Sequence, residues 1–338
     1  MRTILQFMVL ALYATAITAQ QRPPILDVHL HALAANLFGP PPLAMCTPMK
    51  LAPWDPHDEY RDVVATMWKK PACTDPVWSP MSDDELMNET IDVMNRLNIV
   101  GVLSAFEPDR TAKWVAAAPG RFIQAAVLQF GASGPNFTVD SVRDLHAAGK
   151  LSVLGEVISQ YAGIHPNDER MEPYWAVAEE LNLPVGIHVG PASPGAVYLG
   201  AKGYRAHLHS ALTMEEVLVR HPRLRVYLMH AGYPLLDDMI ALLYAHPQVH
   251  VDVSFIAYTQ PRAAFYSYLQ RIVEAGFSDR VMFGSDQMIW PGVIERAVAV
   301  IEEAPFLSEQ DKRDIFYNNA ARFLRLSEEE IAQHRGGQ

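Results

Sequence analysis

Residues 25–32 read ILDVHLHA, a short apolar run that carries two histidines at its end. A continuous apolar run of this length is typical of a strand that is covered on both faces in a parallel sheet. Seven further runs of the same kind follow it along the chain, at 98–105, 121–129, 151–159, 183–190, 224–232, 249–256 and 280–286. Segments with helical spacing of apolar residues separate them. Eight strands that alternate with helices predict an α/β fold, a (β/α)8 barrel of the TIM type.

The alternation is interrupted over residues 33–80, between the first two runs, and again over residues 191–210, after the fifth run. The first of these stretches is rich in proline and includes Trp54, Trp68 and Trp78. Long irregular segments are usually binding loops or lids, so we expect a long insertion after strand 1 that helps to form a binding site. An insertion that serves packing alone is the alternative. We predict that residues 20–338 form a single barrel domain, for which about 250 residues plus insertions suffice.

The first nineteen residues differ from the rest of the chain. Arg2 precedes an uncharged, mostly apolar stretch that ends in small residues at Ala19. The stretch is shorter than the ~20 residues of a spanning helix, so we expect a signal peptide over residues 1–19 and a secreted or periplasmic protein. An uncleaved membrane anchor is the alternative.

Two cysteines, Cys46 and Cys73, lie in the insertion. In an exported protein they could form a disulfide, and two unlinked thiols are the alternative.

The chain is acidic, with a formal net charge of −11 over 338 residues. Nucleic acids and anionic membranes bind to basic surfaces, so we expect neither as the main partner. A small-molecule substrate remains the expected partner. The sequence does not decide between a monomer and a homo-oligomer.

Histidines gather at the ends of the predicted strands. His29 and His31 end the first run, His188 and His230 lie near the ends of the fifth and sixth, and Asp286 ends the eighth. The C-terminal ends of barrel strands meet at one rim, where the sites of TIM barrels lie. One strand-end histidine would more often be structural. Five such residues from four strands favour a metal site, because imidazoles and a carboxylate are ligands of zinc and similar ions.

Glu156 lies within the apolar run 151–159. An unpaired buried carboxylate is costly, so we expect Glu156 to be a metal ligand or a hydrogen-bonding neighbour of the site.

Four motifs together resemble the amidohydrolase superfamily: DVHLH (27–31), GIH (186–188), MHAG (229–232) and GSD (284–286). The resemblance runs from about residue 25 to 326 and points to the amidohydrolase-related branch that contains the aminocarboxymuconate semialdehyde decarboxylases. It implies a divalent metal, usually zinc, held by residues that match His29, His31, His188 and Asp286. The residue that matches His230 would act beside the metal as an acid, a base or an electrostatic partner.

Binuclear amidohydrolases carry a bridging lysine or glutamate where this chain has Glu156. Such a bridge would leave the first-strand histidines and Asp286 on one ion, and His188 with His230 on a second. Because the branch named above is mostly mononuclear, we expect one ion, with two as the alternative. Zinc is expected, and manganese is possible.

These residues suit a hydrolase that acts on an amide, ester or lactone-type bond of a small molecule. Asp286 would accept a proton from water, and His230 would stabilise the charge that develops. The alternative is a metal-dependent, non-oxidative decarboxylase of an aromatic or unsaturated carboxylic acid. A binding protein without turnover is a third hypothesis, which the presence of both Asp286 and His230 disfavours.

Further polar residues lie in the loops that we expect near the rim. Each is expected either to contact the substrate or to face solvent: Arg110, Tyr161, Lys202, Arg205, Tyr258 and Gln287.

Overall fold

The computed structural model describes residues 22–131 and 134–336. The signal peptide expected over 1–19 lies outside these residues. Eight parallel strands follow one another in the sheet in chain order: β1 (Ile25–His31), β4 (Ile99–Ser104), β5 (Phe122–Leu128), β8 (Val153–Val157), β9 (Val185–His188), β10 (Val226–Met229), β11 (Val249–Asp252) and β12 (Val281–Met282). This order confirms the predicted α/β barrel. No helix within the described ranges is both long and apolar enough to cross a membrane.

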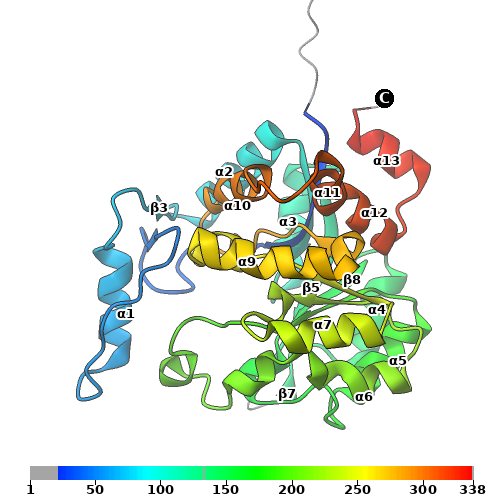
Figure 1. The fold of residues 1–338 in the computed structure, drawn as a ribbon, viewed down its shortest axis with the longest axis horizontal. Coiled ribbons are helices and arrows are strands. Elements are labelled where there is room, and N and C mark those ends of the chain that lie inside the picture. The colour runs from blue at the N-terminus through cyan, green and yellow to red at the C-terminus, as the bar shows by residue number, and fades with distance from the viewer. Residues whose placement is uncertain (1–21, 132–133, 337–338) are drawn as a thin grey trace, which may run out of the picture.

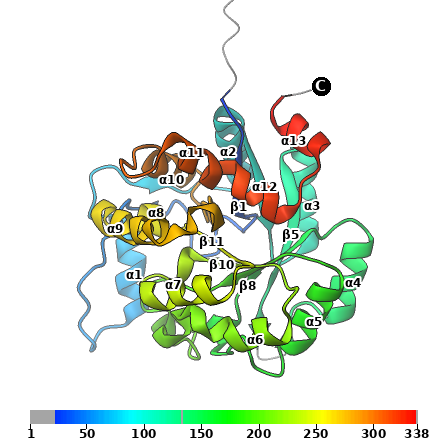
Figure 2. The ribbon, with the colours of Figure 1, turned by 45° about the vertical axis from the view of Figure 1, so that its right-hand side comes forward.

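Helices surround the strands, as Figures 1 and 2 show. One helix follows each strand, or the insertion after β1: α2 (Asp83–Leu97), α3 (Pro108–Ala117), α4 (Val139–Ala147), α5 (Glu172–Glu180), α6 (Glu215–Arg220), α7 (Leu236–Ala245), α9 (Arg262–Ile272) and α10 (Val293–Glu302). Because helices cover its outer face and side chains fill the inside, β1 is buried at all seven positions. The continuous apolar runs of the sequence follow from this double burial.

The two ends of the sheet meet at β1. The backbone N–H of Val28 donates to the carbonyl of Phe283 at 3.0 Å, and that of Asp286 donates to the carbonyl of His29 at 2.7 Å. The segment that follows β12 is therefore hydrogen-bonded to the first strand. This seam places the histidines of β1 beside Asp286, although more than 250 residues separate them in the chain.

A register shift in β1 changes the side of the strand to which the following side chains point. The pairing of β1 with β4 is irregular between Asp27 and Leu30. Leu26 and Val28 pack in an apolar cluster at the base of the barrel, whereas His29 joins the group of possible metal ligands and His31 lines the cavity at the mouth. An extra residue in a strand changes the side to which the following side chains point, so the bulge lets β1 contribute both to the core and to the site.

The C-terminal segment covers the base of the barrel. Tyr317 and the helix α12 (Asn319–Leu324) pack against Leu26 and Val28 in the same apolar cluster, and α13 (Glu328–His334) follows. The base is thereby filled with side chains, and the open end of the barrel is the rim that carries the histidines.

The expected insertion after β1 is present and has its own small framework. It contains β2 (Ala44–Met45), α1 (Tyr60–Lys69) and β3 (Val77–Trp78), and β2 pairs with β3 in antiparallel fashion. Figure 1 shows α1 on one side of the barrel. The hydroxyl of Tyr60 donates to the carbonyl of Pro194 at 2.9 Å, which ties α1 to the loop after β9.

Cys46 and Cys73 form a disulfide within this insertion, with their Cα atoms 5.8 Å apart. The bond links the residue after β2 to the segment between α1 and β3. It closes a loop across a sequence separation of 27 residues.

We expect the double variant Cys46→Ser/Cys73→Ser to lose about 3 kcal/mol of unfolding free energy, because a disulfide over a loop of this length restricts the unfolded chain. Urea unfolding of the variant and the wild type measures the difference. Wild-type protein kept in reductant is the control and should match the variant. Equal unfolding midpoints for variant and oxidised wild type would show that packing alone holds the insertion.

Candidate metal centre

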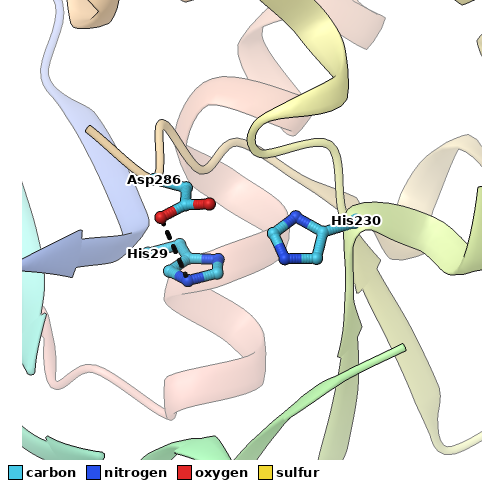
Figure 3. Close-up of side chains that lie close together, drawn as sticks. All are labelled: His29, His230 and Asp286. Atoms are coloured by element: carbon cyan, nitrogen blue, oxygen red, sulfur yellow. Dashed lines mark ion pairs between the residues drawn. The ribbon is translucent and has the colours of Figure 1, made fainter. Parts of the chain in front are cut away.

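Six ionisable side chains from five strands meet at the rim of the barrel. They are the six that the sequence analysis singled out: His29 and His31 of β1, Glu156 of β8, His188 of β9, His230 after β10 and Asp286 after β12. All six are buried. Figure 3 shows His29, His230 and Asp286 facing one another. The rim thus collects nitrogen and carboxylate donors in the combination that zinc-like ions prefer.

The imidazoles of His29 and His31 face each other through their Nε2 atoms. Their Nε2 atoms lie 3.1 Å apart. Nδ1 of His29 lies 2.8 Å from Oγ of Ser254, and that hydroxyl itself donates to Asp252, so Nδ1 of His29 is the donor. Nδ1 of His31 lies 3.0 Å from Oγ of Ser104, which donates to a backbone carbonyl. In the neutral form of each ring, Nε2 therefore carries the lone pair.

Two facing lone pairs at this distance repel each other unless a cation lies beside them. The hydroxyls of Ser104 and Ser254 hold the two rings so that neither can offer a proton to the other. Outer partners that fix the tautomer in this way are a general feature of metal-binding histidines. The donor set on β1 therefore fits a divalent ion.

A second pair of imidazoles lies opposite. Nε2 of His230 is 3.1 Å from Nδ1 of His188. Nδ1 of His230 donates to the carbonyl of Ser254 at 3.1 Å, which leaves its Nε2 as an acceptor directed into the cluster. Nε2 of His188 is buried and has no hydrogen-bond partner among the residues that the structure describes.

The carboxylate of Glu156 lies between the two pairs. Its Oε2 is 3.5 Å from Nε2 of His31 and 3.8 Å from Nε2 of His29. Its Oε1 contacts Nδ1 of His188 and lies 3.7 Å from Nε2 of His230. The donors thus divide into two groups that share Glu156, each with its ligand atoms within 4.8 Å of one another.

Asp286 completes the cluster from the last strand. Its Oδ1 lies 3.2 Å from Nε2 of His31 and 3.9 Å from Nε2 of His29, the contact drawn in Figure 3. Together with His29 and His230 it forms a third group of possible ligands. The hydroxyl of Tyr258 donates to its carbonyl at 2.8 Å and helps to hold its backbone.

Electrostatics keep both carboxylates ionised. Burial opposes ionisation of Glu156, but its contacts with the imidazoles, that of His188 foremost, outweigh burial, so its pKa lies well below the ordinary value. Burial opposes ionisation of Asp286 in the same way, and the nearby imidazoles, that of His29 foremost, lower its pKa. Two buried negative charges among imidazoles form a site that a divalent cation would neutralise.

The backbone is strained at several of these positions. His230, Phe255, Asp286 and Met288 have φ angles of 60°, 61°, 50° and 46°. Such left-handed conformations cost roughly 1–2 kcal/mol for residues other than glycine. Strain of this kind clusters at functional sites, where the surrounding structure maintains it. No local sequence signal indicates it here.

Asp252 and Ser254 are supporting residues that the sequence analysis missed. Asp252 is fully buried; its Oδ2 lies 3.2 Å from Nδ1 of His29, and its Oδ1 accepts from the backbone N–H of His230 at 2.9 Å. The signal that pointed to Glu156, a carboxylate within an apolar run, is present at Asp252 too. Asp252 connects both pairs of imidazoles.

Of the six loop residues considered in the sequence, only Tyr161 lines the cavity at the metal centre. Gln287 is fully buried and clamps the end of β1, because its side chain accepts from the N–H of His31 at 2.9 Å. Arg110 pairs with Asp83 at 2.7 Å. The ring of Tyr161 lies 5.1 Å from that of His188.

Comparison with known proteins agrees with this geometry. A family model described as amidohydrolase matches residues 26–326. The chain belongs to the amidohydrolase family. The resemblance noted in the sequence is thereby confirmed, and members of this superfamily typically bind a divalent metal. No curated protein matches this amidohydrolase significantly.

Solved structures with the same fold include three with low sequence identity. An uncharacterised TIM-barrel protein from Bordetella bronchiseptica has a TM-score of 0.59 and 16% identity, covering 91% of this chain and 99% of its own. The 5-carboxyvanillate decarboxylase of Sphingomonas paucimobilis has 0.53 and 19%, with 70% and 82% covered. A probable 2-pyrone-4,6-dicarboxylic acid hydrolase from Acinetobacter baumannii has 0.56 and 15%, with 89% and 99% covered. They show a shared barrel, and their names include both a hydrolase and a decarboxylase.

We expect Asp252→Ala to weaken metal binding by the amidohydrolase about 10- to 100-fold, because His29 and the backbone of His230 would lose the group that orients them. Competition with a chelator, followed by metal analysis, measures the affinity. Asp252→Asn keeps one acceptor oxygen and should retain part of the affinity. Wild-type affinity in Asp252→Ala would show that Ser254 alone orients the rings.

Proposed function

We propose that this amidohydrolase is a metal-dependent hydrolase of amide, ester or lactone-type bonds in small molecules, and that the two groups of donors that share Glu156 would each hold a divalent ion. The observation that carries the proposal is the position of this carboxylate, with one oxygen near the β1 histidines and the other near His188 and His230. Zinc is the first choice for such donors, and manganese is the second.

The division of donors favours two ions over the single ion that the family branch led us to expect. A shared carboxylate between two groups of ligands is the arrangement of two-metal enzymes, which act mainly on carbonyl and phosphoryl groups. When bound, such ions supply Lewis acidity, which polarises a carbonyl oxygen and makes water a stronger acid.

The protein's own residues provide the proton transfers. Asp286 lies at the mouth of the barrel as a carboxylate, so it can accept the proton that attacking water loses. His230 faces Asp286 across the cluster in Figure 3 and can stabilise negative charge on the substrate oxygen. Burial and the charges of the two carboxylates hold the pKa of Tyr161 well above its ordinary value, so its hydroxyl stays protonated and can donate to the substrate.

Decarboxylation remains the second candidate, supported by the family and by the name of one structural relative. That reaction needs a proton donor for the carbon that loses carbon dioxide. Asp286, held as a carboxylate, is poorly suited to this role, which leaves His230 alone. Hydrolysis uses both residues as they stand, and for this reason we rank it first.

We also propose that the protein is exported and acts on a small molecule rather than on nucleic acid. The Cys46–Cys73 disulfide supports export, since disulfides persist mainly in oxidising compartments. The acidic charge of the chain supports the choice of substrate.

Metal analysis tests the proposal directly. We expect about two zinc or manganese ions per chain in the wild type and about one in Glu156→Gln, with hydrolysis slowed about 100-fold or more, because the shared ligand is lost. Glu172→Gln is the matched control: Glu172 contacts His221 at 2.8 Å, away from the cluster, and the substitution should change neither value.

Two results would contradict the proposal in different ways. One ion per wild-type chain, with normal content in Glu156→Gln, would return Glu156 to a supporting role. Release of carbon dioxide from aromatic acids by the metal-loaded enzyme, without hydrolysis of esters, lactones or amides, would replace hydrolysis by the second candidate.

A further inference from the structure

The cavity at the metal centre has two unlike parts. Its floor carries the ionisable ligands, and its walls away from them are apolar. We call four of these residues, contributed by the insertion and by the loops after β4 and β11, the apolar wall: Leu37, Phe38, Phe106 and Phe255. The cavity has a volume of about 200 Å³, which suits a small compound.

Resting on the proposed hydrolase function, we infer that the substrate places an uncharged, flat apolar group against the apolar wall. The enzyme thereby rejects compounds that carry an anionic group at the end remote from the scissile bond. None of the described residues that line the cavity is a lysine or an arginine.

Two tryptophans pack against Phe38 of the apolar wall. The ring of Phe38 stacks on that of Trp290, with centroids 5.8 Å apart and planes within 7°. Trp68 contacts Phe38 edge-on at 5.5 Å. Nε1 of Trp290 donates to the carbonyl of Leu43 at 2.8 Å and fixes the indole. Phe38 therefore has little freedom to move aside for a charged, hydrated group.

The cations of the neighbouring loops are occupied elsewhere. Arg110 pairs with Asp83 at 2.7 Å. The guanidinium of Arg205 donates to the backbone carbonyls of Lys202 and Tyr204 at 2.9 and 2.7 Å. Lys202 lines a separate hollow, which lies on the other side of Tyr161. Lys69 of the insertion donates to the carbonyls of Pro40 and Pro42, and no lysine or arginine among the described residues lines the cavity.

An anion at the apolar wall would lose its hydration without gaining a partner. Removing water from a carboxylate is costly unless it is paired, and apolar side chains offer no pairing. A substrate carboxylate would find a charged partner only at the metal site. There it would compete with the scissile group for the same position.

The test compares two esters that differ in one remote group, 4-methylphenyl acetate and 4-carboxyphenyl acetate. With metal-loaded enzyme, and after correction for uncatalysed hydrolysis, we expect kcat/KM to favour the methyl compound by about 100-fold. Calorimetry with the corresponding acetanilides, whose amide bond is far less reactive than the ester, measures binding separately from turnover. It should show the same preference.

A charge placed in the wall should reverse part of this preference. The side chain of Leu37 is 44% exposed, so Leu37→Arg can be accommodated without burying the new charge. We expect the variant to reduce the preference about tenfold, by gaining activity on the carboxylate. Leu37→Gln removes the apolar contact without adding charge, and Tyr244→Arg adds the charge at a residue that is 85% exposed on α7; neither should reproduce the gain.

The outcomes separate this inference from the proposed function. Equal or faster hydrolysis of the carboxylate would overturn the inference and leave the hydrolase function standing. If none of the esters, lactones and amides tested is hydrolysed but the neutral anilide binds more tightly, the inference holds and the proposed function fails. If there is neither hydrolysis nor preferential binding of the neutral anilide, both are overturned.

Discussion

The geometry of the metal centre depends on one buried carboxylate, that of Asp252, which is not itself one of the proposed ligands. Asp252 receives Nδ1 of His29 on one oxygen and the backbone N–H groups of His230 and Ser254 on the other. Asp252 lies at the end of β11, the strand next to β10. It therefore connects His29 on β1 to His230, which follows β10. Because each ring is held on its outer nitrogen, the inner nitrogens must present lone pairs to the cavity. A cation is the natural complement of such an arrangement.

Closure of the barrel is the second constraint. The hydrogen bonds from Val28 to Phe283 and from Asp286 to His29 bring the first and last strands together, and without them Asp286 would lie far from β1. The bulge in β1 then turns its histidines toward the mouth while Val28 stays in the core. The same few residues thus satisfy both the packing of the barrel and the placing of the donors.

Much of this architecture could be predicted from the sequence, because apolar runs and strand-end histidines are local patterns. The eight strands and the six converging side chains follow from them. The division of the donors around Glu156 could not be predicted, since it depends on which nitrogen of each ring points inward. Ser104 and Ser254 decide that, and both are distant from His31 and His29 in the chain. For Arg110 the sequence left a substrate contact and a solvent-exposed residue as alternatives, and the structure pairs it with Asp83.

The chemistry and the choice of substrate reside in different parts of the chain. The donors come from the barrel strands, whereas Phe38 and Leu37 come from the insertion, which the Cys46–Cys73 disulfide closes on itself. Phe38 is packed against Trp290 and Trp68, so little freedom remains to be lost when a ring binds. An insertion of this kind can change its lining residues without touching a metal ligand. The substrate can therefore differ between barrels that share the same rim of histidines, and the acids named for two of the structural relatives need not fit this cavity.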